Sequence, residues 1–323
     1  MPRHFLVDTD LTPEEQSEVL DLAAALKADR FSRRPLAGPQ TVGIIFDKTS
    51  TRTRVSFAAG VSDLGGNPLI INPGESQLGH KETVADSARV LSRMLAAIVW
   101  RTYAQSGLEE MAEFSDVPVI NALSDDYNPC QILADLLTLR EEFGDVAGRT
   151  LVYLGDAANN MANSYLLGCA TAGMHVRVAG PEGYLPREDV VAAARERAEL
   201  TGGSVLVTTD AREALKDADA VVTDTWVSMG QESEKTERAQ IFTPYSVTSE
   251  AMAHAADDAV FLHCLPAYRG FEVAADVIDG PASRVWDEAE NRVHAQKALL
   301  AFLLDSSGLA ADLPAALRRE EAR

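Results

Sequence analysis

The segment Lys48–Arg54, with the sequence Lys-Thr-Ser-Thr-Arg-Thr-Arg, groups hydroxyl and guanidinium side chains just after an apolar run that ends at Phe46. This pattern predicts a strand that turns into a helix, whose free backbone N–H groups and positive dipole end face the turn. The hydroxyls add donors, and Arg52 can hold two phosphate oxygens in a bidentate fork. An ordinary helix N-cap before a charged helix face is the alternative. Two arginines interleaved with hydroxyls favour an anion site.

A second arginine, Arg101, ends the apolar run Ala97–Arg101. Ligands of open α/β sheets bind at the carboxyl ends of the strands, so we expect Arg101 to contact the same anion. By itself, this arginine is equally consistent with a solvated strand end. The chain has no G-x-x-x-x-G-K-[ST] pattern, which argues against a nucleotide P-loop. Residues Gly155–Asn160 lack the glycines of a dinucleotide fingerprint, which argues against a nicotinamide site.

Short apolar runs alternate with helical patterns and must position these groups. The predicted strands are Val42–Phe46, Leu69–Asn72, Ala97–Arg101, Val117–Asn121, Leu151–Gly155, Val176–Ala179, Val205–Thr208, Ala220–Thr223 and Val260–Cys264. The helical patterns include Arg54–Leu64, Thr83–Met94, Gln131–Phe143 and Asn160–Ala172, and a capping box at Thr12–Glu15 opens a helix that reaches about Lys27. Buried strands interleaved with helices predict an α/β fold with doubly wound parallel sheets.

The chain of 323 residues is long enough for two domains. Four predicted strands precede the helix over 131–143 and the others follow it, so we expect domains over 1–143 and 146–286, joined by interdomain helices. The helix over 287–305 is expected to pack back on the first domain. Residues 311–323 are expected to form an exposed tail.

The formal net charge of −20 disfavours nucleic acid and anionic membranes as partners, but not a small phosphorylated substrate. Cys130, Cys169 and Cys264 lie far apart and match no zinc spacing, so we interpret them as reduced thiols of a cytoplasmic protein. The first residues lack the apolar core of a signal peptide, and no apolar run approaches the length of a membrane span.

Six stretches resemble motifs of the aspartate and ornithine carbamoyltransferases. Ser50–Arg54 resembles the phosphate motif, and Glu290–Arg292 resembles the C-terminal arginine segment of the family. Four others resemble the ornithine branch: Gln77–Glu82 (Gln-Leu-Gly-His-Lys-Glu), Asn159–Ala162 (Asn-Asn-Met-Ala), Asp224–Gly230 (Asp-Thr-Trp-Val-Ser-Met-Gly) and His263–Pro266 (His-Cys-Leu-Pro). The resemblance covers about residues 3–305 in the expected order. It implies transfer of a carbamoyl group from carbamoyl phosphate to the side-chain amine of ornithine, which gives citrulline.

The resemblance also implies a role for each matching residue. Carbamoyl phosphate would be bound by Ser50, Thr51, Arg52, Thr53, Arg101, Asn128, Gln131, Leu265 and Arg292. Gln77 would reach the site of a neighbouring subunit, which implies a homotrimer with shared active sites. Ornithine would be bound by Asn160, Asp224, Ser228 and Met229. Arg52, Arg101 and Cys264 would act in catalysis, with Cys264 and the carbonyl of Leu265 beside the reacting centre.

The implied chemistry requires a neutral amine. An aliphatic amine has a pKa near 10.4, so making it neutral at pH 7.4 costs roughly 4 kcal/mol. Positioning and exclusion of water can offset much of this cost, and the arginines can stabilise charge on the leaving phosphate. We expect neither a metal nor a cofactor. Asp224 would pair with the α-amino group of the substrate, and Cys264 would orient the side-chain amine.

Three positions depart from the family pattern. Asn128 stands where relatives usually have a histidine that donates to the carbamoyl oxygen; an asparagine amide also donates, but it is shorter and never cationic. Ala58 replaces a common glutamate, and Tyr268–Phe271 follows the His-Cys-Leu-Pro turn in place of histidine and acidic residues. These departures leave two alternatives open. One is a carbamoyltransferase for another amine, and the other is a weakly catalytic regulatory paralogue that binds carbamoyl phosphate.

Overall fold

The computed structural model describes residues 2–75, 81–227 and 235–309 and confirms the predicted α/β fold class. The chain divides into two compact units. The first unit comprises Met1–Asp10, Ser17–Cys130 and Arg292–Arg323, and the second comprises Leu11–Gln16 and Gln131–Asn291. Each unit contains one sheet in which all strands are parallel.

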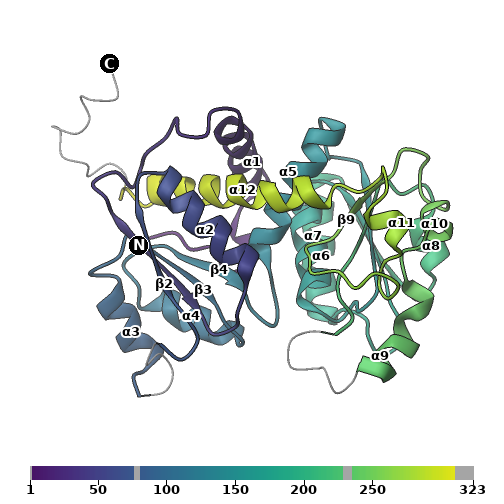
Figure 1. Cartoon of the computed structure of the whole chain (residues 1–323), viewed down its shortest axis with the longest axis horizontal. Helices are drawn as coiled ribbons and strands as arrows, with labels where there is room; N and C mark the ends of the chain where they lie inside the picture. Colours follow the sequence, from purple (N-terminus) through teal and green to yellow (C-terminus); the bar gives the residue numbers. More distant parts are fainter. Residues whose placement is uncertain (1, 76–80, 228–234, 310–323) are drawn as a thin grey trace. The chain divides into compact units, whose positions relative to one another are not determined.

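The sheet of the first unit has the strand order β2-β1-β3-β4. Its strands are β1 (Thr41–Phe46), β2 (Asn67–Ile71), β3 (Ala97–Arg101) and β4 (Val119–Leu123). Helix α2 (Thr51–Asp63) and the C-terminal part of α12 (Val285–Ser306) lie on one side of it, and α3 (Val84–Leu91) and α4 (Gln105–Glu113) lie on the other (Figure 1). Most of α1 (Pro13–Ala28) also belongs to this unit.

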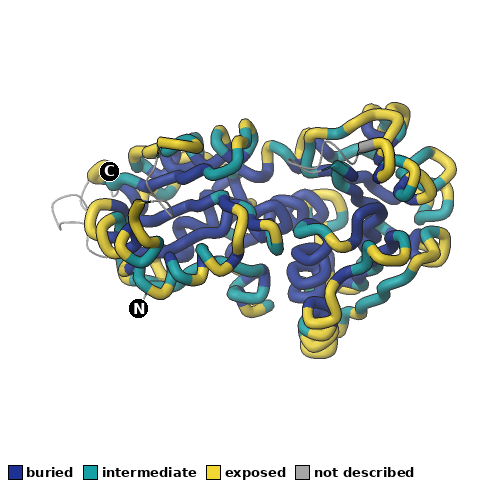
Figure 2. Tube along the Cα trace, turned by 90° about the horizontal axis from the view of Figure 1, so that it is seen from below, coloured by how far each residue is buried: buried dark blue, intermediate teal, exposed yellow. Residues whose placement is uncertain are grey.

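Apolar side chains fill the space between this sheet and the α3–α4 pair. Ile98 and Trp100 from β3 pack with Leu108 and Met111 from α4, and all four are at least nine-tenths buried. Burial of each large apolar side chain contributes about 1.5–3 kcal/mol, so this layer fixes the positions of the strands. Figure 2 colours the chain by burial, with buried residues in the interior of each unit and exposed residues at the periphery.

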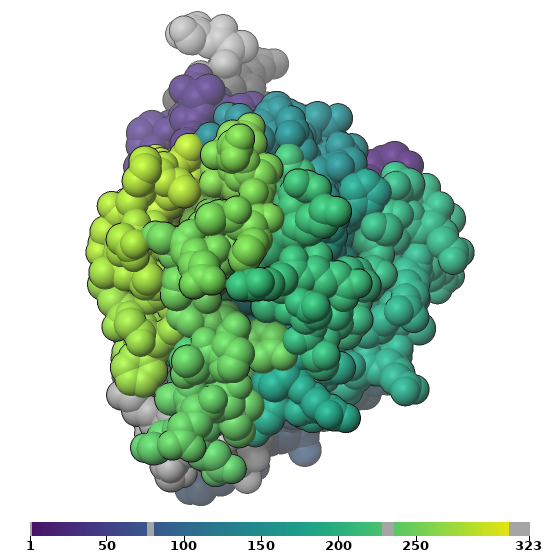
Figure 3. Space-filling model, turned by 90° about the vertical axis from the view of Figure 1, so that its right-hand side faces the viewer, coloured from purple at the N-terminus to yellow at the C-terminus, as the bar shows by residue number. Residues whose placement is uncertain are grey.

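The sheet of the second unit has the strand order β7-β6-β5-β8-β9. Its strands are β5 (Thr150–Leu154), β6 (His175–Ala179), β7 (Ser204–Thr208), β8 (Ala220–Thr223) and β9 (Val260–Leu262). Its helices are α5 (Pro129–Phe143), which begins in the first unit, α6 (Asn160–Thr171), α7 (Glu188–Thr201), α8 (Ala211–Leu215), α9 (Lys235–Phe242), α10 (Ser249–Met252) and α11 (Ala275–Ile278). Helices α6 and α7 pack together on one face of the sheet, and Figure 3 looks onto the side that carries α8, α10 and α11.

The strands follow the sequence prediction closely, with ends that differ by up to two residues. The last predicted strand is the informative difference, because β9 ends at Leu262 and Cys264 therefore lies in the turn that follows. Helix α2 begins at Thr51, earlier than predicted, because Ser50 caps it. The predicted capping box is present: the backbone N–H of Thr12 donates to Glu15 Oε2 at 3.0 Å, and the N–H of Glu15 donates to Thr12 Oγ1 at 3.2 Å.

A buried lysine fastens α12 to α2 within the first unit. The ammonium group of Lys297 is fully buried and donates to the carbonyl of Arg30 at 2.7 Å, and it lies 3.3 Å from Asp63 Oδ2. Its side chain also passes close to Gly60, where an added Cβ would lie 3.0 Å from Lys297 Cγ. The same carboxylate accepts from Arg30 Nε at 2.8 Å. The far end of α2 is therefore fixed by packing and by charge.

Substitution of Lys297 separates these two contributions. We expect Lys297→Ala to lower the free energy of unfolding by about 3 kcal/mol, because it removes one partner of a buried ion pair and leaves a cavity. We expect Lys297→Met to cost less, since it refills the volume while Arg30 still pairs with Asp63. Urea unfolding measures both, with the exposed Lys216→Ala as a control expected within 0.5 kcal/mol of wild type. Equal losses for the alanine and methionine variants would contradict this account.

Candidate active site

The first unit gathers cationic and hydroxyl groups where its strand order reverses. The chain passes from β1 to β2 on one side and then returns to β3 on the other, so the carboxyl ends of β1 and β3 are neighbours. Phe46 is in register with Arg101, and the N–H of Asp47 donates to the carbonyl of Arg101 at 2.9 Å. The predicted anion ligands Ser50 and Arg101 therefore lie at one sheet edge, at the kind of position where open α/β sheets bind ligands.

Ser50 organises the start of α2. It is extended, with φ of −159°, and its Oγ accepts from the N–H of Thr53 at 3.3 Å and donates to Thr53 Oγ1 at 3.0 Å. The hydroxyl of Thr53 is fully buried and accepts from Arg292 Nη2 at 2.8 Å. The structure thus brings Arg292 from α12 to the same helix terminus as Ser50. Thr51 and Arg52 form the first turn of α2 and are exposed and partly buried, respectively.

A cation beside this terminus was not among the predicted ligands. Lys48 forms an ion pair with Asp125, and its ammonium group lies 4.3 Å from the centroid of the Tyr103 ring. Lys48, Tyr103 and Asp125 come from the segments that follow β1, β3 and β4, so the pair connects three loops of the same sheet edge. The sequence contained a signal for it, because Lys48 opens the phosphate motif.

Asn128 and Gln131 lie at the start of α5. Asn128 is buried and precedes Pro129, the first residue of the helix, a position that proline favours. Gln131 is fully buried and belongs to the second unit. Its Nε2 donates to Asp135 Oδ1 at 2.8 Å and to Glu288 Oε1 at 3.0 Å. These two carboxylates therefore set the orientation of the Gln131 amide.

The second unit has its own reversal of strand order, at β5 and β8. Asp156 follows β5, Asp224 follows β8, and Cys264 follows β9, so these three side chains start from neighbouring strand ends. Gly155 makes the first turn possible. Its φ is 129°, and an added Cβ would lie 3.3 Å from both Thr223 Oγ1 and Trp226 Nε1. Only glycine fits this position without strain.

Asn160 is the first residue of α6, at the same edge of the sheet. The preceding residue, Asn159, caps the helix by accepting from the N–H of Ala162 at 2.9 Å, and its Nδ2 donates to Tyr153 Oη at 2.8 Å. This arrangement fixes the helix start. Asn159 is therefore the N-cap of α6, and Asn160 is the first residue of its first turn.

Asp224 and Cys264 are in direct contact. The thiol donates to Asp224 Oδ1 at 3.3 Å, and the N–H of Thr225 donates to the same oxygen at 2.7 Å. Burial raises the pKa of the Asp224 carboxyl. Burial and the Asp224 charge raise the pKa of the Cys264 thiol well above its usual value. The thiol is therefore protonated at neutral pH and acts as a polar neighbour, not as a thiolate base.

Asp224, His263 and Cys264 also resemble a metal-ligand set, because their donor atoms lie within 4.8 Å of one another. The Nδ1 of this histidine, however, is engaged. It accepts from the N–H of Leu265 at 2.9 Å, and Nε2 lies 3.4 Å from Glu272 Oε1. A metal bound through Nδ1 would therefore displace the hydrogen bond from the Leu265 backbone.

An arginine outside the predicted set is buried beside this edge. Arg238, from α9, forms an ion pair with Asp156 and donates to the carbonyl of Trp226. Its guanidinium group also lies 5.4 Å from the Tyr184 ring centroid and 5.0 Å from that of Phe242. Burial raises the pKa of Asp156, and the charge of Arg238 opposes this shift. No sequence motif indicates this role, because Arg238 stands in a polar stretch like any solvated arginine.

Three predicted site residues, Gln77, Ser228 and Met229, lie outside the described residues.

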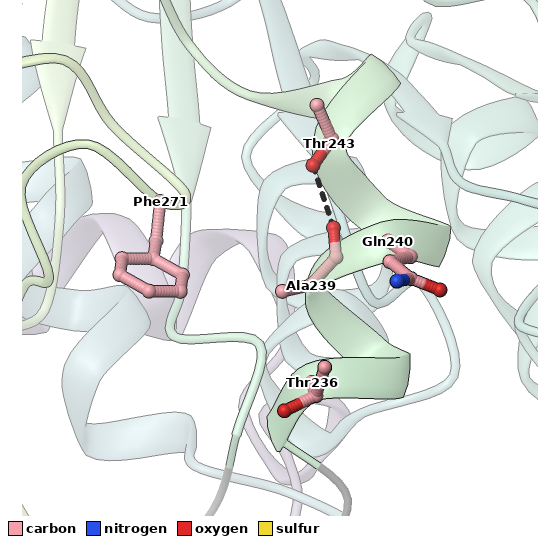
Figure 4. Close-up of a pocket in the computed structure, with 5 residues that line it drawn as sticks. All are labelled: Thr236, Ala239, Gln240, Thr243 and Phe271. Atoms are coloured by element: carbon pink, nitrogen blue, oxygen red, sulfur yellow. Dashed lines mark hydrogen bonds between the residues drawn. The ribbon is translucent and has the colours of Figure 1, made fainter.

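A hollow of about 350 Å³ lies along α9 and is lined by Thr236, Ala239, Gln240 and Thr243 opposite Phe271 (Figure 4). The hydroxyl of Thr243 donates to the carbonyl of Ala239 at 2.6 Å. Because none of its lining side chains is ionisable, this hollow has no group for acid–base chemistry.

Both units match known protein domains. Residues 3–141 match the family description "Aspartate/ornithine carbamoyltransferase, carbamoyl-P binding domain", and residues 147–303 match "Aspartate/ornithine carbamoyltransferase, Asp/Orn binding domain". The chain belongs to the aspartate/ornithine carbamoyltransferase family. This confirms the family resemblance inferred from the motifs.

Individual relatives agree with this assignment to the carbamoyltransferase family. The chain is 68% identical to an ornithine carbamoyltransferase of Renibacterium salmoninarum, over 95% of this chain and 100% of the relative. It is also 68% identical to one of Clavibacter sepedonicus, with the same coverage of each chain. The solved ornithine carbamoyltransferase from Pyrococcus furiosus superposes with a TM-score of 0.89 at 47% identity, over 93% of this chain and 96% of that one.

The raised pKa of Asp224 predicts that its carboxylate lowers the free energy of unfolding while it contributes to ornithine binding. The folded protein binds this proton more tightly than the unfolded chain, so the group lowers stability progressively as the pH rises from its unfolded pKa through its folded pKa. We expect Asp224→Asn to raise the free energy of unfolding by about 0.5–2 kcal/mol at pH 7.5 and to weaken ornithine binding. The gain should disappear near pH 4.

Thermal unfolding at several pH values, with ornithine calorimetry, measures both effects. The exposed Asp257→Asn is the matched control. A lower free energy of unfolding in Asp224→Asn than in wild type at pH 7.5 would contradict the conclusion that the ionised Asp224 side chain destabilises the fold.

Proposed function

We propose that this chain transfers the carbamoyl group of carbamoyl phosphate to the side-chain amine of L-ornithine, giving L-citrulline and phosphate. The observation that carries the proposal is the agreement along the whole chain. Both family domains match in order, and a relative that is 68% identical over 95% of the chain is named ornithine carbamoyltransferase. The nitrogen of the amine bonds to the carbamoyl carbon, the bond from that carbon to the phosphate oxygen breaks, and the amine loses a proton.

The phosphate end of the substrate is assigned to the first unit. Ser50, Thr51, Arg52 and Thr53 would hold the phosphate at the N-terminus of α2, with Arg101 and Arg292 as further cations. Support comes from the buried link between Thr53 and Arg292 and from the shared sheet edge of β1 and β3. These positive charges and the helix dipole would stabilise the negative charge that develops on the leaving phosphate.

The carbamoyl group is assigned to Asn128 and Gln131. The side-chain amide of Asn128 can donate to the carbamoyl oxygen, as the histidine of relatives would. The amide of Gln131 is held on its NH₂ side by Asp135 and Glu288, so its carbonyl is the end suited to accept from the carbamoyl NH₂. Both side chains are buried, which strengthens such hydrogen bonds.

The amino acid is assigned to Asn160, Asp224, Ser228 and Met229. The Asp224 carboxylate would pair with the α-ammonium group, and this pairing would lower its raised pKa on binding. The side-chain amine would be oriented by the neutral thiol of Cys264 and by the carbonyl of Leu265. Leu265 has φ of 58°, a left-handed conformation that redirects this carbonyl relative to an extended strand. Arg52, Arg101 and Cys264 are the residues proposed to act in catalysis.

The expected domain division stays part of this proposal. Residues 1–143 are assigned to carbamoyl phosphate and residues 146–286 to the amino acid, with the helix over 287–305 packed on the first domain. The expected tail over 311–323 lies outside the described residues. Two observations support this division: the family domains match 3–141 and 147–303, and Arg292 and Lys297 of α12 contact α2 within the first unit.

We also propose a homotrimer in which Gln77 reaches a neighbouring site. The first unit exposes large apolar side chains, including Val55 at 59%, Met94 at 71% and Leu69 at 43% on the edge strand β2, and such surfaces commonly mark interfaces. Light scattering should give a mass of about 104 kDa, three times the 34.8 kDa of one chain. A mass near 35 kDa or 70 kDa would refute the trimer.

A cytoplasmic location is proposed from the three cysteines, which are unbridged and lie in different parts of the fold. Within residues 2–75, 81–227 and 235–309, the helices lack the combination of length and apolarity that a bilayer crossing requires. The two alternative functions, another amine acceptor and a regulatory paralogue, are not favoured, because the most similar proteins named above are ornithine carbamoyltransferases.

The deciding experiment is citrulline formation by the purified protein from carbamoyl phosphate and ornithine. We expect turnover in wild type and a loss of at least 10²–10³-fold in Arg52→Ala, because a charged phosphate ligand is removed. Arg212→Ala, whose side chain is largely exposed, should match wild type. Lysine, 2,4-diaminobutyrate, putrescine and N-acetylornithine serve as competing acceptors. Higher turnover with one of them than with ornithine would overturn the proposed substrate.

A further inference from the structure

A single buried carboxylate in the second unit serves two segments of the proposed site. Glu288, in the first turn of α12, is about 1% exposed. Its Oε1 accepts from Gln131 Nε2 at 3.0 Å, and its Oε2 accepts from the backbone N–H of His263 at 2.8 Å. Each oxygen therefore holds one donor, and the two donors belong to segments far apart in the sequence.

On the Gln131 side, the carboxylate is part of a chain of buried hydrogen bonds. Nε2 of Gln131 also donates to Asp135 Oδ1 at 2.8 Å, and Asp135 Oδ2 accepts from Tyr165 Oη at 2.5 Å. Asp135 and Tyr165 are fully buried. Two acceptors on one NH₂ group use both of its hydrogens. The side-chain amide of Gln131 therefore cannot flip by 180° without the loss of two buried hydrogen bonds.

On the other side, the carboxylate holds the residue that shapes the turn after β9. His263 Nδ1 accepts from the N–H of Leu265 at 2.9 Å, and a backbone N–H can only donate. In the neutral ring, the proton is therefore on Nε2, which faces Glu272. Glu272 in turn accepts from the N–H of Tyr268. The turn that presents Cys264 and Leu265 is thus fixed at its start by Glu288 and inside by His263.

We propose that Glu288 is a positioning residue for carbamoyl transfer, which holds Gln131 and the Cys264–Leu265 turn in their working orientations through its two oxygens. This inference rests on the proposed function. Glu288 touches neither substrate in this account and acts through Gln131 and His263. A carboxylate is required because both partners are donors, and its place in the first turn of α12 stabilises the negative charge.

The isosteric variant Glu288→Gln tests the requirement for two acceptors, because glutamine offers one oxygen and one NH₂ group to two donors. We expect the Kd for carbamoyl phosphate to rise by about 10-fold or more, while the Kd for inorganic phosphate stays within about twofold of wild type. Phosphate alone would contact Ser50–Thr53, Arg101 and Arg292, all in the first unit. We expect kcat with ornithine to fall about 10- to 100-fold.

Asp287→Asn is the matched control, because it removes an exposed carboxylate from the same helical turn. Glu288→Asp keeps two acceptor oxygens on a shorter stem and should lie between wild type and Glu288→Gln. Equal weakening of phosphate and carbamoyl phosphate binding would overturn the proposal, since it would indicate general damage to the fold. Wild-type behaviour of folded Glu288→Gln would overturn it as well.

A measurement on the wild-type protein covers the case in which Glu288→Gln does not fold. Nitrogen-15 NMR of labelled histidine should show Nδ1 of His263 without a proton, and a proton on Nδ1 would refute the turn geometry on which the proposal depends. The comparison of phosphate with carbamoyl phosphate needs no turnover. An absence of citrulline in wild type would therefore reject the proposed function and still leave the role of Glu288 decided.

Discussion

Parallel strand pairing is the constraint on which both halves of this protein depend. In a doubly wound sheet, each crossover returns the chain to the same end, so the loops that leave the strands gather at the carboxyl edge. Where the strand order reverses, two neighbouring strands send their helices to opposite faces, and the space above their ends is left for a ligand. The first unit places Ser50 and Arg101 at such a point, and the second places Asp156 and Asp224 there.

Local charge explains how a strongly acidic chain can hold an anion. The net charge of −20 creates a long-range field that is screened by salt beyond about 10 Å. At the N-terminus of α2, the proposed anion ligands would act at hydrogen-bond distance, and the buried hydroxyl of Thr53 joins Arg292 to the Ser50 cap. Contacts at this range in a partly buried setting outweigh the distant surface carboxylates.

The second unit buries several carboxylates, and such groups are costly to remove from water. Asp135, Glu272 and Glu288 are each at least 99% buried, and every one of them accepts at least one hydrogen bond from a named donor. Satisfied in this way, such groups specify one arrangement of side chains, whereas a half-satisfied network would be worse than an apolar core. Asp224 differs because its raised pKa shows that burial is only partly compensated. Incompletely compensated burial of this kind is common where a ligand supplies the missing partner.

The sequence by itself determined the fold class, the order of the strands along the chain, the family and the dense group of hydroxyls and arginines at the start of α2. These features depend on local patterns: apolar runs, caps, and a dense motif whose members are neighbours in the chain. The tertiary structure alone decided which side chains far apart in the sequence are in contact. Arg238 is buried against Asp156, and Glu288 joins Gln131 to His263, although no sequence motif marks either residue. Asp135 is paired with Tyr165, which lies thirty positions away along the chain. Such pairings depend on how helices cross the sheet, which is set by packing over the whole unit and leaves no periodic trace in the sequence.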